Sequence, residues 1–207
     1  MHARVKTFEN ISPVVRDLTL TTLFAALTAL GAQIAVRLPF SPVPITLQVL
    51  MVIGAGLVLG SRRGPASQLL YLTVGVVGLP VFAGGTGGPA VLLGPTGGYL
   101  VAFPAAAFAA GWLAEKSEAA SWLGWLIASL AALAVIYSSG ASWLAIWLWV
   151  TGASSLPTAL NGAWRLGIAP FFLADLAKAI LVALTLRGAR TLLTTWFGAD
   201  ALDHIAE

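Results

Sequence analysis

Residues 79–103 read LPVFAGGTGGPAVLLGPTGGYLVAF, and this stretch decides how the rest of the chain is interpreted. It is dense in glycine, carries three prolines and has no charged residue. Glycine lets the backbone turn tightly and approach a ligand, whereas proline prevents one regular helix. Non-helical backbone at membrane depth must be packed in protein or line a cavity, because its polar groups find no water there. We interpret the stretch as the wall or lid of a small-molecule pocket. The alternative is a tight turn that lets helices pack closely.

The composition is that of a membrane protein with several spans. Of the 207 residues, 58% are hydrophobic and 9% are charged, and the mean hydropathy is +0.91. An ordinary soluble domain carries about 25% charged residues. The chain has no cysteine, and its two histidines, His2 and His204, lie near its ends. Disulfides, thiol catalysis and a histidine-based metal site within the membrane are therefore excluded.

The hydrophobic pattern predicts an all-α polytopic membrane protein, a compact bundle of six transmembrane helices. It is expected to form one substrate-binding domain over residues 1–207, with a core of about 18–187 and cytoplasmic tails 1–16 and 188–207. The Gly-rich segment lies between the third and fourth helices, on the extracellular side. The segment 142–150, SWLAIWLWV, is shorter than the roughly 20 residues of a span. We predict a partial or re-entrant helix there. The predicted spans are about 18–36, 45–60, 65–78, 99–113, 121–137 and 170–186.

The basic residues indicate the orientation. With six spans and the N-terminus inside, Arg37 and Arg165 fall outside the cell, and Lys178 lies within a span. The excess inside is what the positive-inside rule requires, so both termini are expected in the cytoplasm. Basic residues spread so thinly do not form a nucleic-acid-binding stripe, and no nucleic-acid partner is expected. The residues expected inside are Arg4, Lys6, Arg16, Arg62, Arg63, Lys116, Arg187 and Arg190.

The chemistry concentrates at Asp175 and Lys178, the two charged residues of the last span. Ionisable groups within spans are costly and usually face a cavity, and residues three apart share one face of a helix. An aspartate accepts N–H donors and a lysine donates to a carbonyl or carboxylate, which suits a small ligand carrying both. The alternative is an ion pair that only lowers the cost of burial. Neutral hydrogen bonds could come from Gln48, Gln68, Tyr71, Tyr99 and Asn161.

Four motifs resemble the BioY family, the biotin-specific substrate-binding membrane subunits (S components) of energy-coupling factor (ECF) vitamin transporters. They are PVPITLQ (42–48), GLPVFAGGTGG (78–88), GPTGGYLVAF (94–103) and DLAK (175–178), and the match covers about residues 18 to 187. The resemblance implies a six-helix fold in the cell membrane that binds biotin from the extracellular side. It also implies a transmembrane coupling subunit and two cytoplasmic ATPases as partners. The chain has no GxxxxGK[ST] motif, so ATP would be hydrolysed only by those partners, and no cofactor is expected.

The resemblance also assigns roles to residues. Asp175 would accept from the ureido N–H groups of biotin, and Lys178 would donate to the ureido carbonyl or the tail carboxylate. The small residues Ala25 and Ala29, four apart on the first span, would contact the helix of the coupling subunit; on spacing alone, the alternative that alanine is simply common here fits equally well. The expected substrate-binding residues are Asp175, Lys178, Gln48, Phe82, Gly84, Gly85, Thr96, Gly97, Tyr99, Asn161 and Trp164.

Other functions remain open at this stage. The chain could be the S component for another small vitamin, or a biotin carrier that acts without ATPase partners. An enzyme is not expected, because a DxxK motif without histidine or cysteine nearby is poor catalytic material. A scaffold subunit without a ligand would not need Asp175 and Lys178.

Overall fold

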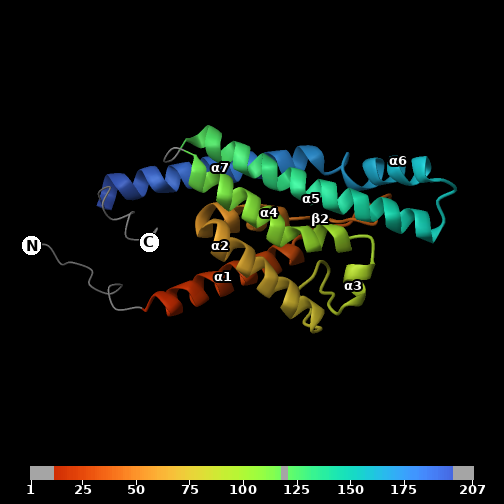
Figure 1. Cartoon of the computed structure of the whole chain (residues 1–207), viewed down its shortest axis with the longest axis horizontal. Coiled ribbons are helices and arrows are strands. Elements are labelled where there is room, and N and C mark those ends of the chain that lie inside the picture. Colours follow the sequence, from red (N-terminus) through yellow and green to blue (C-terminus); the bar gives the residue numbers. More distant parts are fainter. Residues whose placement is uncertain (1–11, 118–120, 198–207) are drawn as a thin grey trace, which may run out of the picture.

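The computed structural model describes residues 12–117 and 121–197, with side chains as far as residue 185. Most of the predicted tails, including His2 and His204, lies outside these residues. The long helices of the second half of the chain run along the molecule, whereas the long helices of the first half lie obliquely to them (Figure 1). In chain order the elements are α1 (Pro13–Gln33), β1 (Ala35–Val36), β2 (Ile45–Thr46), α2 (Gln48–Val76), α3 (Ala90–Leu93), α4 (Gly97–Lys116), α5 (Trp122–Thr151), α6 (Leu156–Gly167) and α7 (Phe172–Phe197).

Helix α4 is the centre of the packing, between α2 and α5, and α1 packs on α2. Its inward positions are mostly alanine and glycine, with Ala106, Ala107 and Ala110 fully buried. Small residues let helices approach closely where lipid offers no hydrophobic drive for association. Gly56 lies where α2 and α4 approach each other closely, because a Cβ there would fall on the carbonyl oxygen of Ala107.

Helix α2 contains both of the predicted spans 45–60 and 65–78. Gly60 breaks it with a φ of 77°, a left-handed conformation that glycine adopts readily. Glu115 of α4 accepts hydrogen bonds from the backbone N–H and the hydroxyl of Ser61, both at 2.7 Å. A carboxylate is favourable at the N-terminus of a helix, so Glu115 stabilises the restart of α2. Arg63 pairs with Asp17 of α1 at 3.0 Å.

The prediction of a separate short helix at 142–150 is wrong, because α5 continues through it to Thr151. Residues 138–140, between the predicted span 121–137 and the segment 142–150, are part of the same helix. The Ser139 hydroxyl donates to the carbonyl of Gly98 at 2.9 Å, so it links α5 to the first turn of α4 and does not interrupt α5. Gly140 leaves room for the ring of Tyr99. The Trp143 indole donates to the carbonyl of Gly94 at 2.8 Å, which ties α5 to the Gly-rich segment.

Within the described residues, α1, α4 and α5 are long and apolar enough to cross a membrane. Helices α6 and α7, bent by 49° at a short break, would count as a fourth crossing if they form one span.

The Gly-rich segment folds back on the end of α2. The N–H of Gly88 donates to the carbonyl of Gly75 at 2.7 Å, and the N–H of Phe82 donates to the carbonyl of Thr86 at 2.9 Å. A Cβ on Gly97 would fall on the carbonyl of Leu92, so this glycine allows α3 and α4 to meet closely. The segment therefore contains both close packing and, at residues 82–83 and 95–96, cavity wall.

Candidate ligand-binding site

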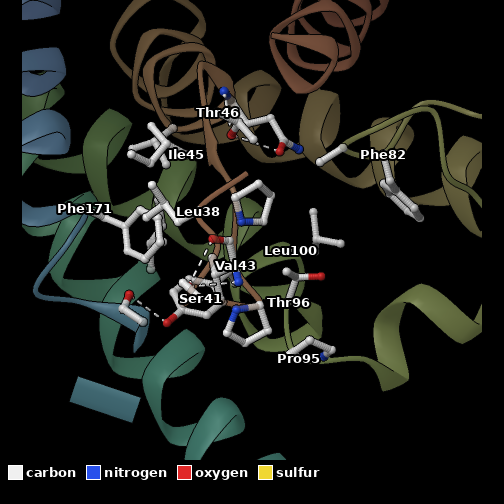
Figure 2. A pocket seen from close by; sticks show the side chains of 18 of the residues that line it. Leu38, Ser41, Val43, Ile45, Thr46, Phe82, Pro95, Thr96, Leu100 and Phe171 are labelled. Carbon is white, nitrogen blue, oxygen red and sulfur yellow. Dashed lines mark hydrogen bonds between the residues drawn. The ribbon is translucent and has the colours of Figure 1, made fainter. Parts of the chain in front are cut away.

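A cavity of about 420 Å³ lies between residues 37–49, the Gly-rich segment with the start of α4, the middle of α5 and the start of α7. Its size is typical of small-molecule sites, which range over roughly 300–1,000 Å³. Figure 2 shows apolar side chains around it from several elements, among them Leu38, Ile45, Leu100 and Phe171. An apolar wall with few polar groups suits a ligand that has an apolar body and a polar head.

A charged cluster lies at one end of this cavity. Asp175 lines it and is 5% exposed. One carboxylate oxygen accepts from Nζ of Lys178 at 2.7 Å, and the other accepts from the hydroxyl of Tyr137 at 2.6 Å. Lys178 also donates to the carbonyl of Thr46 at 2.7 Å. Lys178 and Tyr137 thus hold the carboxylate of Asp175, which lines the cavity, in a fixed orientation.

A neutral hydrogen-bonded chain lies next to this cluster, at the start of α2. The amide of Gln48 donates to the hydroxyl of Tyr71 at 2.7 Å, and its carbonyl oxygen accepts from Thr46 Oγ1 at 3.1 Å. The Tyr71 hydroxyl donates in turn to the carbonyl of Val81 at 3.2 Å. Gln48 lines the cavity, so its amide is presented to a ligand in a fixed orientation.

Two aromatic side chains of the predicted site, Phe82 and Tyr99, line the cavity. Phe82 is 1% exposed and meets Tyr71 edge-on, with ring centroids 5.5 Å apart. Gly75 makes this possible, because a Cβ there would fall on the Phe82 ring. The Tyr99 hydroxyl donates to the carbonyl of Gly167 at 2.9 Å. Thr96 also lines the wall.

Several predicted site residues lie elsewhere. Trp164 is 59% exposed, and Asn161 lines a separate groove with Arg165. Helix α6 turns its small residues inward, at Ala159, Ala163 and Gly167, so the intervening large side chains point outward. The other predicted residues outside the lining are Lys178, Gly84, Gly85 and Gly97.

Sequence reasoning missed the residues that the chain brings from α5 and from the segment before β2. Tyr137 is the last residue of the predicted span 121–137, a position that indicates no role. The proline-rich segment, residues 37–44, lies between the first two predicted spans, yet most of it lines the cavity. Ser41 holds it there by donating to the carbonyl of Leu166 at 2.6 Å. The sequence did indicate that this segment could line a cavity, because it resembles the Gly-rich segment in being non-helical and largely apolar between two hydrophobic helices.

The two alanines predicted to contact a partner helix face the interior. Ala25 is 7% exposed and belongs to the core, and Ala29 packs partly against it. The exposed face of α1 carries Thr22 and Ala26 instead. A motif of small residues does not by itself state which side is outward, and the contact of Ala25 and Ala29 with a partner helix stays a prediction.

The model of the BioY family matches residues 1–195 of this chain. The chain belongs to the BioY family. This BioY-family protein is 44% identical over 176 residues to a probable biotin transporter BioY from Pyrococcus horikoshii, covering 84% of the chain and 97% of the relative. It is 39% identical over 170 residues to the biotin transporter BioY from Thermotoga maritima, covering 82% and 93%.

A solved structure agrees with this membership. The protein matches the crystal structure of the S-component for biotin from an ECF-type ABC transporter with a TM-score of 0.73. The two are 31% identical, and the match covers 86% of this chain and 92% of the other. The all-helical fold of this BioY-family protein is therefore that of a multi-pass membrane protein.

Proposed function

We propose that this BioY-family protein binds biotin and takes it up across the cell membrane as the S component of an ECF transporter. The observation that carries the proposal is the buried Asp175 carboxylate, held by Tyr137 and Lys178 at one end of an apolar cavity. The matched relatives, whose names describe biotin transporters, agree with it.

The chemistry of the cavity suits biotin from one end to the other. The ureido ring offers two N–H donors and a carbonyl. Asp175 has lone pairs left on the oxygens that Tyr137 and Lys178 already occupy, so it can accept from a ureido N–H. The Gln48 amide can pair with the ureido carbonyl, and the fused apolar rings would lie against the Phe82 and Leu100 side of the wall. Lys178 supports this site by orienting Asp175.

The arrangement in the membrane follows from the order of the helices. Six passes result if α1, the two halves of α2, α4, α5 and the α6–α7 pair each cross once. In Figure 1 the start of α1 and the end of α7 lie at the left, and α3 and α6 lie at the right. Both termini would then be cytoplasmic and the cavity would open outward, in agreement with the positive-inside rule. The whole chain would be one substrate-binding domain.

The partners are a transmembrane coupling subunit and two cytoplasmic ATPases, which would supply all the ATP hydrolysis. The exposed face of α1 with Thr22 and Ala26 is the better candidate for the coupling contact, since Ala25 is buried within this chain. The alternative functions are an S component for another small vitamin and a biotin carrier without ATPases.

Biotin should bind tightly to the purified protein, and analogues with an altered ureido ring should bind at least about 10-fold more weakly. A missing N–H leaves a buried acceptor unpaired, which costs about 1–3 kcal/mol. Isothermal titration with biotin, an analogue whose ureido N–H groups are replaced by sulfur or oxygen, and thiamine measures the difference. Equal affinity for biotin and thiamine would overturn the proposed function.

Substituting Ala26 with leucine should impair biotin uptake by cells that hold the complete transporter, while biotin binding by the isolated subunit stays within about twofold. A bulky side chain on a small-residue face keeps a partner helix at a distance. Ala134→Leu, on the exposed face of α5, is the matched control and should leave uptake normal. Normal uptake by the Ala26→Leu protein would show that the coupling subunit contacts another face.

A further inference from the structure

Arg37 lines the ligand cavity and is exposed at its mouth. It is the one cationic side chain among the described residues that line this cavity. Within residues 12–117 and 121–185, no carboxylate forms a salt bridge with it. A guanidinium group carries five N–H donors in a planar fork and stays charged at any physiological pH. Arg37 therefore presents an uncompensated positive charge to whatever enters.

The strand pairing relates the backbone position of Arg37 to that of the charged cluster. β1 and β2 are antiparallel, with Ala35 opposite Thr46. Thr46 is the residue whose carbonyl accepts from Lys178, so it marks the level of the Asp175 end. Arg37 follows two residues beyond Ala35, which corresponds to roughly 7 Å along an extended chain. The cavity thus has an anionic end at Asp175 and a cationic end at Arg37.

We propose that Arg37 binds the carboxylate at the end of the biotin tail; this inference rests on the proposed function. The ureido ring lies at the Asp175 end, and the acyl chain runs along the apolar wall toward the mouth. Lys178 is not needed for the carboxylate, because its ammonium already donates to Asp175 and to Thr46. A guanidinium matches a carboxylate with two parallel N–H···O bonds, which gives direction as well as affinity.

Gly84 has a specific role in this arrangement. A Cβ built on Gly84 would fall on Nη2 of Arg37, so the absence of a side chain leaves the guanidinium its place over the Gly-rich segment. The neighbouring Gly85 has a similar backbone conformation, with a φ of 69° against 73° for Gly84. A Cβ on Gly85 would meet no atom within 4 Å. The two glycines differ in their contact with Arg37 and not in their backbone strain.

The test compares biotin with its primary amide, which keeps the rings and the chain length but has no negative charge. Wild-type protein should prefer biotin to the amide by about 10-fold or more, because a charge-assisted bond is roughly twice as strong as a neutral one. Arg37→Gln should lose most of this preference by binding biotin more weakly while binding the amide as the wild type does. Arg37→Lys should retain part of it. Arg165→Gln, an exposed arginine outside the cavity, should bind both ligands as the wild type does.

The glycine pair provides a second and independent measurement. Gly84→Ala should lower the ratio of biotin to amide affinity, because it displaces the guanidinium. Gly85→Ala should leave that ratio unchanged, whatever the added backbone strain does to both affinities together. Isothermal titration of the five purified arginine and glycine variants with both ligands gives all the ratios.

An Arg37→Gln protein that keeps the wild-type preference for biotin over the amide would overturn the inference. If its affinities for biotin and for the amide were both lower by the same factor, Arg37 would have a structural role. A wild-type protein that binds neither ligand would instead overturn the proposed function, and the inference with it.

Discussion

Asp175→Asn and Lys178→Met should each lower the affinity for biotin by about 100-fold. Asp175→Asn removes a charged acceptor that faces the cavity, and a hydrogen bond to a charged group contributes about 1.5–3 kcal/mol. Lys178→Met removes the donor that orients the carboxylate at 2.7 Å. Each single change also leaves one charge buried without its partner, which is strongly destabilising. Lower thermal stability is therefore expected for both variants, and it does not by itself distinguish a ligand-binding pair from a structural one.

The double variant Asp175→Asn, Lys178→Met separates these two roles. It has no stranded charge, and the amide of the new asparagine can still accept from Tyr137 and keep that contact, which is 2.6 Å in the wild type. We expect a stability close to that of the wild type and a biotin affinity no better than that of either single variant. Lys116→Met, at the exposed end of α4, controls for the loss of one positive charge. A stable double variant with near-native biotin affinity would reduce the pair to a structural role.

Gly56→Ala should destabilise the protein, whereas Gly54→Ala, two residues earlier in the same helix, should be neutral or stabilising. A Cβ on Gly56 would overlap the carbonyl of Ala107 and approach the Cβ of Ala110 to 2.7 Å. Overpacking of this kind costs about 1–3 kcal/mol, and here both obstacles belong to α4 and cannot rotate away. A Cβ on Gly54 would meet only Phe24, at an ordinary 3.8 Å. Alanine is also the better helix former, by about 1 kcal/mol.

The thermal unfolding of the purified variants in detergent measures this difference, and the biotin affinity of each variant shows whether the cavity is disturbed. The two substitutions add the same methyl group to the same helix, so the propensity effect cancels in the comparison. Equal midpoints of thermal unfolding for Gly56→Ala and Gly54→Ala would contradict the close contact between α2 and α4 at Gly56.

Part of the site was predictable because its chemistry is rare within a membrane. Asp175 and Lys178 stand out in an apolar span, since burying a charge requires a reason. Phe82, Thr96 and Tyr99 belong to Gly-rich motifs whose composition already indicated a pocket. Trp164 carried no comparable signal, because an aromatic side chain serves equally well on the outer face of a short helix as in a cavity wall.

The sequence by itself determined the class of the protein, the helical segments near both ends and the polar pair of the last span. These follow from hydrophobicity and from the cost of isolated charges, which are local properties of the chain. Only the tertiary structure decided that α5 continues to Thr151, that Tyr137 bonds Asp175, and that Ala25 faces inward. Each of these depends on which neighbour a side chain meets. Tyr137 and Asp175 are 38 residues apart in the chain, and helical periodicity states which residues share a face but not what that face meets.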